Sequence, residues 1–316
     1  MGNRIIITGA AGFIGSTLID TLLRNGQKVM GIDNFDPFYD RTIKEENISS
    51  ALQDSGFQFK EGDIRDNTFL DKCLSEFNPD IIIHLAAKAG VGPSLINSRE
   101  YYNVNVMGTL NLLEVVRKNC VKKMIFASSS SVYGNNPKIP FSETDTVDFP
   151  ISPYAASKKA GELLCYTYHH LYQISILCLR FFTVYGPRQR PDLAIHRFVK
   201  AILNNETISI YGDGSNKRDF THVDDIVKGI IGAVENLSGY DIYNLGGSKA
   251  VSLNDLVSMI EKYTFRKAIL KYLPLKDGDV IQTFADIKKA REKLSFNPEI
   301  DIETGIKTYI QGFKNY

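Results

Sequence analysis

The stretch Arg4-Ile-Ile-Ile-Thr-Gly-Ala-Ala-Gly-Phe-Ile-Gly15 determines the fold. Its β-branched run predicts a buried strand, and the glycines that follow predict a tight turn leading directly into a helix. Gly9 permits the turn, Gly12 lets backbone N–H groups approach a diphosphate, and Gly15 lets helix and strand pack closely. The stretch therefore predicts a dinucleotide site at the N-terminus of this helix.

A carboxylate follows at the spacing that such a site requires. Lys28-Val-Met-Gly-Ile-Asp33 predicts a second strand, and Asp33 lies 18 positions after Gly15. An acid at this position holds the ribose hydroxyls of the adenosine and repels a 2′-phosphate. Neither Asn34 nor Phe35 is a cation that would reverse this choice. We therefore expect NAD rather than NADP.

The composition favours a globular enzyme with a large core. The chain has 316 residues, of which 43% are hydrophobic and 23% charged, and a net charge of +1. No basic run favours nucleic acid or an anionic membrane surface as a partner. No apolar run is long enough to span a bilayer and no signal-type segment follows Met1, so we expect a cytoplasmic protein. The four cysteines have no metal-type spacing, and we expect buried thiols, no disulfides and no metal site.

Strand and helix patterns alternate along the first half of the chain. Further strands are predicted over 57–63, 80–87, 122–128 and 174–182, with helices over 66–77 and 101–119 between them. This alternation predicts an α/β fold with a doubly wound parallel sheet of the Rossmann type. Glycine and proline become frequent after residue 183. We therefore expect a dinucleotide-binding domain over 1–182, rejoined by about 222–246, and a smaller α/β substrate domain over 183–316.

The octapeptide Ser152-Pro-Tyr-Ala-Ala-Ser-Lys-Lys159 predicts the start of a helix, with Ser152 as N-cap and proline at the first position. Tyr154 and Lys158 then share one helix face, four residues apart. The ammonium would lower the phenol pKa from about 10 toward neutrality, so Tyr154 could act as a general base toward a sugar hydroxyl. A bare Tyr-x-x-x-Lys pair is common by chance, but this one follows a serine-rich strand end in a dinucleotide fold.

Motifs along nearly the whole chain resemble the extended short-chain dehydrogenases/reductases, specifically the nucleotide-sugar 4-epimerases. They are Gly9-x-x-Gly12-x-x-Gly15, His84-Leu-Ala-Ala, Ser128-Ser-Ser-Ser-Val-Tyr-Gly134, Tyr154-x-x-x-Lys158, Arg180-Phe-Phe-Thr-Val-Tyr-Gly-Pro and Arg218-Asp-Phe-Thr-His-Val-Asp-Asp. The resemblance implies that Ser129 completes a Ser-Tyr-Lys triad and that Lys158 also holds the nicotinamide ribose. The NAD-binding residues implied or predicted are Gly9, Gly12, Phe13, Ile14, Gly15, Asp33, Asn34, Asp63, Ile64, Leu85, Ala86, Ala87, Lys88, Asn105, Ser128, Tyr154, Lys158 and Phe181.

The resemblance also implies a mechanism. Tyr154 removes the proton of the sugar 4-hydroxyl while C4 gives hydride to NAD⁺. The 4-keto sugar turns over and takes the hydride back on its other face, so NAD is regenerated and should stay bound. The expected substrate-binding residues are Ser129, Ser130, Ser131, Tyr154, Thr183, Arg190, Ala194, Ile195, Arg218 and Asp279. Arg190 and Arg218 are expected to grip a uridine diphosphate, and Lys276 departs from an arginine that is frequent in the family.

The reaction and the sugar are separate questions. Related dehydratases and decarboxylases carry carboxylates where this chain has Ser130-Ser131, which favours plain epimerisation. Thr183 and the stretch Gly186-Pro-Arg-Gln-Arg-Pro-Asp-Leu-Ala-Ile-His196 resemble UDP-glucuronate 4-epimerases, whereas Gly92 is closer to the UDP-glucose pattern. UDP-glucuronate is therefore the expected substrate, with UDP-glucose or UDP-N-acetylglucosamine as alternatives. A net oxidoreductase and a non-catalytic NAD sensor stay open as well. The helices 101–119 and 153–172 are expected to form a homodimer interface.

Overall fold

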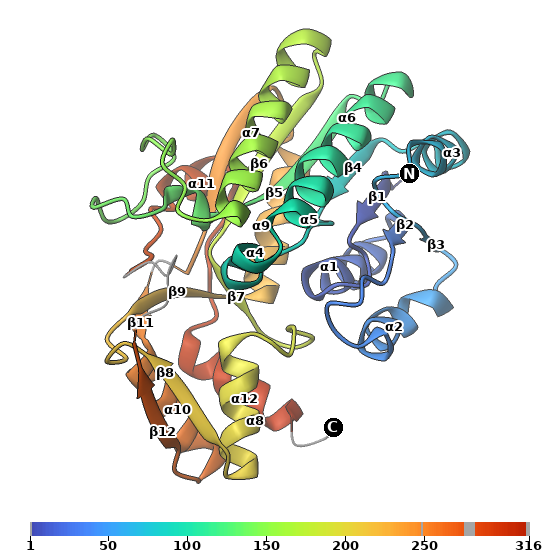
Figure 1. Ribbon diagram of the computed structural model, residues 1–316. Helices are drawn as coiled ribbons and strands as arrows, with labels where there is room; N and C mark the ends of the chain where they lie inside the picture. The colour runs from blue at the N-terminus through green and yellow to red at the C-terminus, as the bar shows by residue number, and fades with distance from the viewer. Residues whose placement is uncertain (1, 248, 275–281, 314–316) are drawn as a thin grey trace.

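A seven-stranded parallel sheet forms the centre of the molecule (Figure 1), in a computed structural model that describes residues 2–247, 249–274 and 282–313. Its strand order is β10-β6-β5-β4-β1-β2-β3, and every neighbouring pair runs parallel. The predicted α/β fold with a doubly wound sheet is therefore confirmed. The strands are β1 (Arg4–Thr8), β2 (Lys28–Asp33), β3 (Phe57–Glu61), β4 (Ile81–His84), β5 (Lys123–Ser129), β6 (Ser175–Phe181) and β10 (Tyr240–Leu245).

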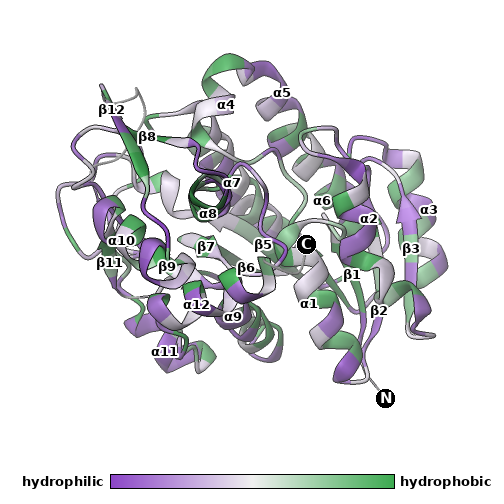
Figure 2. Cartoon of the chain, turned by 90° about the horizontal axis from the view of Figure 1, so that it is seen from below, coloured by the Kyte–Doolittle hydropathy of each residue, from purple (hydrophilic) through white to green (hydrophobic). Residues whose placement is uncertain are grey.

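Burial in the sheet follows the position of each strand. All four residues of β4 are buried, as expected for a β-branched strand that is covered on both faces. The edge strand β3 is less buried, since only Phe57 is buried while Gln58 and Glu61 are exposed, and Figure 2 shows hydrophilic colour on it. The apolar runs of the sequence thus mark the interior strands, because helices cover both of their faces.

Helices pack on the two faces of the sheet in separate hydrophobic clusters. One face is covered by α1 (Phe13–Arg24), α9 (Val223–Glu235) and α11 (Lys288–Leu294), and the other by α3 (Asn67–Phe77), α6 (Gly108–Lys118) and α7 (Pro153–Tyr172). Shorter elements join them, namely α2 (Arg41–Ser49), η1 (Ala51–Gln53), α4 (Val91–Ile96), α5 (Ser98–Tyr102), the π-helical turn η2 (Asn103–Met107) and η3 (Ser130–Tyr133). None of the described helices is both long and apolar enough to cross a membrane.

A smaller α/β unit with its own hydrophobic core lies below the sheet in Figure 1. It contains β7 (Thr183–Tyr185), α8 (Ala194–Asn204), β8 (Thr207–Tyr211), β9 (Lys217–His222), β11 (Ala250–Ser252), α10 (Leu253–Thr264), β12 (Ile269–Leu273) and α12 (Ile302–Phe313). Between β9 and β11 the chain returns to the large sheet, where β10 pairs with β6. It returns a second time through α11, which lies between β12 and α12, so the smaller unit is built from three separate parts of the sequence, 183–222, 250–273 and 302–313.

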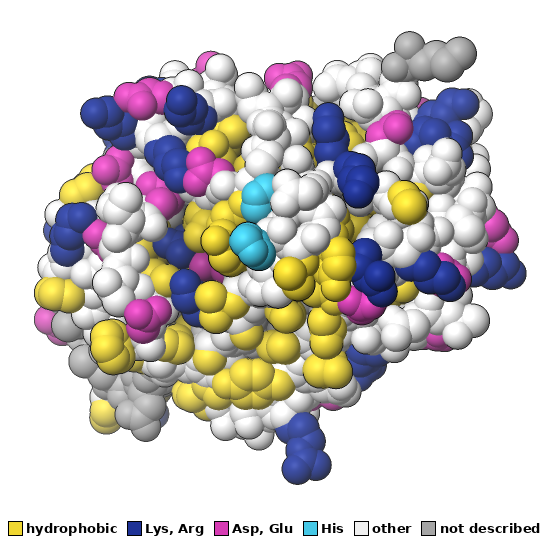
Figure 3. All heavy atoms as spheres, turned by 90° about the horizontal axis from the view of Figure 1, so that it is seen from above, with side chains coloured by type: hydrophobic (Ala, Val, Ile, Leu, Met, Phe, Trp, Pro, Cys, Tyr) yellow, Lys and Arg dark blue, Asp and Glu magenta, His cyan; other side chains and the backbone are white. Residues whose placement is uncertain are grey.

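Large apolar side chains are exposed on the helices that follow β4. They are Leu95, Ile96, Tyr102, Met107, Leu163, Tyr166, Leu171 and Tyr172, from α4, α5, η2 and α7. Figure 3 looks down on the ends of α6 and α7 and shows hydrophobic side chains gathered along one side of the molecule. Contiguous apolar surface of this kind is typical of an interface with another protein.

One expectation about the cysteines is wrong. Cys73, Cys165 and Cys178 are buried free thiols, but Cys120 is exposed. Cys120 has a positive φ of 56° and follows the end of α6, so it lies in a surface turn before β5. Its sequence neighbours Asn119 and Lys122 are polar, in contrast to the apolar surroundings of Cys165 and Cys178.

Candidate active site

The predicted chemical groups meet in one cleft at the carboxyl ends of the central strands. Its volume is about 380 Å³, and it lies where the strand order changes direction between β1 and β4. Ligands of open parallel sheets bind at such a point. The turn after β1, the acid that ends β2, the serines that end β5 and the first turns of α7 all line it.

The start of α1, directly after the glycine turn, leaves backbone donors available to an anion. Gly12 is the N-cap of α1 and supplies no side-chain hydrogen bond to the helix, and the first turn of α1 carries no acidic residue. A Cβ on Gly15 would lie 2.2 Å from the Gly9 carbonyl oxygen, and a Cβ on Gly9 would lie 2.8 Å from the Ala86 nitrogen. Only glycine fits these two positions. The N–H groups of the turn itself donate to Ile32, Asp33 and Gly9, so the donors available to an anion are those of the uncapped first turn of α1.

Asp33 is held in place by the backbone. Its Oδ2 accepts from the Ala11 N–H at 3.0 Å and its Oδ1 accepts from the Phe35 N–H at 2.9 Å. Burial raises the pKa of this carboxyl, while the two backbone hydrogen bonds and the nearby Lys44 ammonium lower it. The carboxylate is therefore fixed at the end of β2, where it can accept hydrogen bonds from ribose hydroxyls.

Ser129 and Tyr154 form the reactive part of the site. Ser131 donates to the Ser129 Oγ from its hydroxyl at 2.9 Å and from its N–H at 3.2 Å, which leaves the Ser129 proton available for another acceptor. Burial raises the pKa of Tyr154, whereas a hydrogen bond with Ser129 and the Arg190 guanidinium lower it. The phenol is thus a partly shielded acid whose ionised form is stabilised by these two groups.

Lys158 is anchored to the strand that carries Ser129. Its Nζ is buried and donates to the carbonyl oxygen of Ala127 at 2.8 Å. Burial lowers the pKa of Lys158 to about 8, and Lys158 is not among the groups that lower the pKa of Tyr154. The shared helix face is as predicted, because Ser152 caps α7 through the Ala155 N–H at 3.2 Å. The predicted lowering of the phenol pKa by the ammonium stays a prediction.

Most of the predicted binding residues line the cleft. They are Gly9, Gly12, Phe13, Ile14, Gly15, Asp33, Asn34, Asp63, Ile64, Leu85, Ala86, Ala87, Lys88, Ser128, Ser129, Tyr154, Lys158, Phe181, Thr183 and Arg190. Among the described residues, Ser130, Ser131, Asn105, Ala194, Ile195 and Arg218 lie outside this lining. Asp279 and Lys276 lie outside the described residues.

Asn105 lies behind the cleft wall. It accepts from the Lys88 N–H at 2.8 Å, and its Nδ2 donates to the Lys88 carbonyl and to Ser157 Oγ, both at 2.9 Å. The amide is buried and its hydrogen bonds are used by the protein. Asn105 therefore fixes the segment that carries Lys88.

Arg190 reaches into the cleft from the loop after β7. Its guanidinium makes two hydrogen bonds to Asp192, at 2.9 and 2.8 Å, and its central carbon lies 5.2 Å from the centre of the Phe38 ring. A bidentate partner of this kind can be exchanged for another anion of similar geometry, such as a phosphate or a carboxylate. Arg190 thus connects the substrate side of the cleft to the loop after β2.

The sequence interpretation missed several groups on this loop and on α2. Lys44 is buried, donates to the Asp36 carbonyl at 2.6 Å and lies over the ring of Tyr39. The carboxylate of Asp36 pairs with the Lys88 ammonium at 2.7 Å. The charged and aromatic character of 34–54 was visible in the sequence, but the spacing gave no sign that α2 turns a cation toward Asp33.

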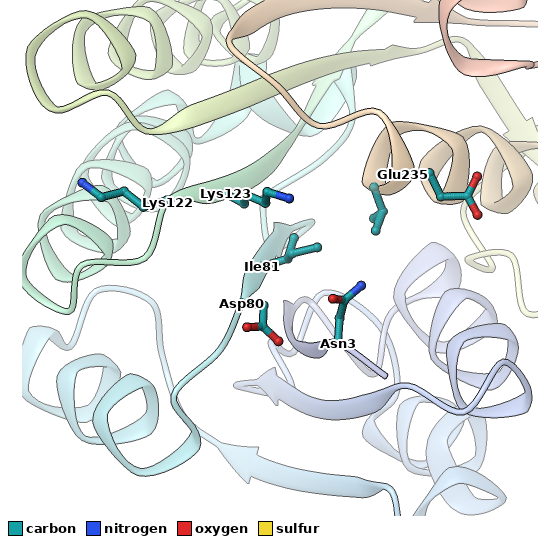
Figure 4. A pocket seen from close by; sticks show the side chains of 7 residues that line it. Asn3, Asp80, Ile81, Lys122, Lys123 and Glu235 are labelled. Carbon is teal, nitrogen blue, oxygen red and sulfur yellow. The ribbon is translucent and has the colours of Figure 1, made fainter. Parts of the chain in front are cut away.

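A second hollow lies at the opposite, amino-terminal edge of the sheet and has a different character. It is lined by Asn3, Asp80, Ile81, Lys122, Lys123, Val234 and Glu235 (Figure 4). All of its charged side chains are exposed to solvent. It contains neither a buried charged group nor a residue of the predicted triad, so the chemistry belongs to the first cleft.

The fold and the Ser-Tyr-Lys cleft define an extended short-chain dehydrogenase/reductase. A sequence model of the family described as GDP-mannose 4,6 dehydratase matches residues 6–309. The chain belongs to this family, and within it to the nucleotide-sugar 4-epimerases.

Named relatives agree closely in length and structure. A UDP-glucuronate 4-epimerase of Thermodesulfobacterium geofontis is 45% identical over 98% of this chain and 95% of its own length. The UDP-glucuronic acid 4-epimerase of Bacillus cereus, solved with UDP-glucuronic acid and NAD, superposes with a TM-score of 0.94 at 41% identity, covering 99% of both chains. The UDP-glucose 4-epimerase of Thermotoga maritima, solved with UDP-glucose, has a TM-score of 0.91 at 33% identity and covers 99% of both chains.

Proposed function

We propose that this protein is an NAD-dependent UDP-glucuronate 4-epimerase that interconverts UDP-glucuronate and UDP-galacturonate through a 4-keto intermediate. The observation that carries the proposal is the meeting of Ser129, Tyr154 and Lys158 in the cleft that also contains the glycine turn and Asp33. The relatives with UDP-glucuronate in their names support the choice of sugar.

The residues of the cleft fit NAD. The uncapped N-terminus of α1 suits a diphosphate, Asp33 suits unphosphorylated ribose hydroxyls, and the small residues Ala86 and Ala87 leave room beside the sheet. Lys158 would hold the nicotinamide ribose. When bound, NAD supplies a reversible acceptor for one hydride. The proposed reaction returns the cofactor to its starting state in each turnover. We therefore expect bound NAD to exchange only rarely with NAD in solution.

The chain's own groups would then handle the proton. The Tyr154 phenolate takes the proton of the sugar 4-hydroxyl, and the Ser129 hydroxyl donates to the same sugar oxygen. Ser129 is prepared for this because both bonds from Ser131 end on its oxygen. After the keto sugar has turned about its link to the diphosphate, Tyr154 returns the proton and the opposite configuration results.

The sugar side of the cleft supports epimerisation without elimination. Ser130 and Ser131 stand where relatives with dehydratase or decarboxylase activity carry carboxylates, so these two positions supply neither a base nor an acid for a second proton transfer. Thr183 lines the cleft and offers a hydroxyl to the C6 carboxylate. Arg190, Arg218 and Asp279 are proposed to contact the nucleotide diphosphate region, together with Ala194 and Ile195 at the start of α8.

A UDP-glucose 4-epimerase is the second candidate. Nothing lies within 4 Å of a Cβ placed on Gly92. Position 92 therefore carries no side chain and no cation that could pair with the carboxylate of a uronate, which favours a neutral sugar. The similarity to the Thermotoga maritima enzyme is compatible with this alternative.

We also propose a homodimer and a cytoplasmic location. The exposed apolar side chains over α4 to α7 support a second copy as the partner, since homodimers pair equal surfaces about a twofold axis. The three buried, unpaired thiols support a reducing compartment.

The reaction is tested with the purified protein and no added NAD. UDP-glucuronate, UDP-glucose and UDP-N-acetylglucosamine are supplied separately, and the configuration at C4 is followed by proton NMR. Conversion of the glucuronate alone, without loss of carbon dioxide, supports the proposal. Turnover of UDP-glucose instead would favour the second candidate, the UDP-glucose 4-epimerase that Gly92 indicates. No turnover of any of the three UDP-sugars would contradict the proposed function.

A further inference from the structure

A buried polar network lies directly behind the proposed catalytic groups. Glu162 is on α7, one turn after Lys158 and two turns after Tyr154, and is only 1% exposed. Its Oε1 accepts from Ser128 Oγ at 2.6 Å and from Arg180 Nε at 2.8 Å, and its Oε2 accepts from Arg180 Nη2 at 2.9 Å. One carboxylate thus joins the catalytic helix to the ends of both β5 and β6.

Arg180 extends the network to the turn that follows Ser129. Its Nη1 donates to the Tyr133 hydroxyl at 2.9 Å, and this hydroxyl donates to Asn244 Oδ1 at 2.7 Å. Tyr133 ends the turn η3, which begins with the residue after Ser129, and Asn244 belongs to β10. The strand end before Ser129 is therefore anchored to the carboxylate, and the turn after it to the guanidinium, of the same ion pair.

An ion pair this deeply buried contributes little net stability. Taking two charges out of water costs about as much as their attraction returns, and an apolar pair of similar size would pack without that cost. What the pair does provide is a bidentate fork with fixed distances and angles. The network therefore restricts geometry more than it strengthens the fold.

Two hydrogen bonds connect α7 to the end of β5, at consecutive residues of the strand. One runs from Lys158 Nζ to the Ala127 carbonyl at 2.8 Å, and the other from Ser128 Oγ to Glu162. Ser129 is the next residue of the strand. The separation between Ser129 and the helix that carries Tyr154 is thus set by this pair of contacts.

We propose that Glu162 is a positioning residue for the proton transfer: through Ser128 and Arg180 it fixes α7 against the end of β5 and so sets the distance between the Tyr154 phenol and the Ser129 hydroxyl. This rests on the proposed function, which assigns the triad. A displacement of about 1 Å in a reacting pair can cost on the order of 100-fold in rate.

The direct test is Glu162→Gln. Glutamine keeps the shape of the side chain but turns one acceptor oxygen into an NH₂ group, so it cannot receive Ser128 and the arginine fork together. We expect kcat to fall about 10- to 100-fold, because the reacting groups move apart. KM for the UDP-sugar should stay within about threefold, because Glu162 contacts none of the residues expected to bind the UDP-sugar. The NAD content of the purified protein should be unchanged.

A second readout does not depend on turnover. Loosening the hydrogen bond from Ser129 raises the pKa of Tyr154, since that bond stabilises the phenolate. The titration of Tyr154 is followed by NMR of protein labelled with ¹³C at the tyrosine Cζ, with the signal assigned by its loss in Tyr154→Phe. In Glu162→Gln the midpoint should move to higher pH, and the acid limb of the kcat profile should move with it. This measurement decides the positioning role even where the substrate assay contradicts the proposed function.

The matched control is Asp225→Asn. Asp225 is a carboxylate that is also 1% exposed, and it accepts from the Glu299 and Ile300 N–H groups at 3.1 and 2.9 Å, outside the cleft. Its loss should lower the unfolding temperature without changing kcat or the Tyr154 titration. If Glu162→Gln does not fold, Tyr133→Phe should give the same two changes at smaller size. A folded Glu162→Gln or Tyr133→Phe with wild-type kcat and titration, or equal changes in Asp225→Asn, would overturn the proposal.

Discussion

The two sides of the cleft hold their functional groups in different ways. On the cofactor side, Asp33 is fixed by two backbone N–H groups and Lys158 by a backbone carbonyl, both at strand ends. On the substrate side, Arg190 lies on a loop and is held by another side chain, Asp192. The backbone thus determines the first set of positions, whereas side chains that can change partners determine the second.

This difference suits the proposed reaction. A cofactor that returns to its starting state in every turnover is best held in one fixed geometry, whereas a sugar that must present both faces needs room to turn. The first prediction below concerns the reacting phenol, which lies between the two sides, and the others alter one side at a time, in order of decreasing expected effect.

Removing the phenol hydroxyl should have the largest effect, because it takes away the group that exchanges the proton with the sugar. We expect Tyr154→Phe to lower kcat by about 10³-fold, within the range for loss of a general base. NAD content and affinity for the UDP-sugar should be unchanged, as measured by absorbance of the released cofactor and by calorimetry. A variant that keeps a tenth of the wild-type rate would contradict the assigned role.

Replacing the buried ammonium tests the cofactor side through pH. Burial lowers the pKa of Lys158 to about 8, so its positive charge is present below that pH and is lost as the pH rises through it. We expect kcat to decline above about pH 8 for this reason. Lys158→Arg should be slower by roughly 100-fold, since the two cations are not interchangeable, but it should lack this alkaline decline. A decline at the same pH in both proteins would assign it to another group.

Crowding the glycine turn should damage the cofactor side alone. The Cβ of Gly15→Ala would lie 2.2 Å from the Gly9 carbonyl, so the turn must open. We expect retained NAD to fall about tenfold and the unfolding temperature to fall by roughly 3 °C, the equivalent of about 1 kcal/mol. Gly312→Ala is the control, because nothing lies within 4 Å of its Cβ and alanine favours the helix. Full NAD occupancy in Gly15→Ala would contradict the conclusion that the backbone geometry of the turn determines the cofactor side.

Removing one hydroxyl should change only the substrate side. Thr183→Val removes a donor to the C6 carboxylate, and one hydrogen bond of about 1 kcal/mol corresponds to roughly a fivefold loss of kcat/KM for UDP-glucuronate. Any turnover of UDP-glucose should be unaffected, because that sugar has no carboxylate. An equal loss for both sugars, measured side by side by NMR, would show that Thr183 does not read the carboxylate.

The parts of the molecule that could be predicted from sequence are those fixed by the local chain. The apolar runs of β1 and β4 predicted interior strands, and the Ser152 cap placed Tyr154 and Lys158 on one face of α7. The environment of Lys158 could not be predicted in this way, since Ala127 lies 31 positions earlier on another element. The same holds for Lys44, whose side chain reaches Asp36 from α2, and for the pairing of Glu162 with Arg180. Spacing reports on neighbours along a helix or strand, but not on contacts between elements.

The account depends on one hydride leaving C4 and returning to it inside a closed site. The most direct measurement uses UDP-glucuronate carrying deuterium at C4, with wild-type protein and no added cofactor, and follows the label in the product by NMR. The account predicts that UDP-galacturonate keeps the deuterium at C4. Exchange of the label for hydrogen from solvent, or its accumulation in released NADH, would contradict it.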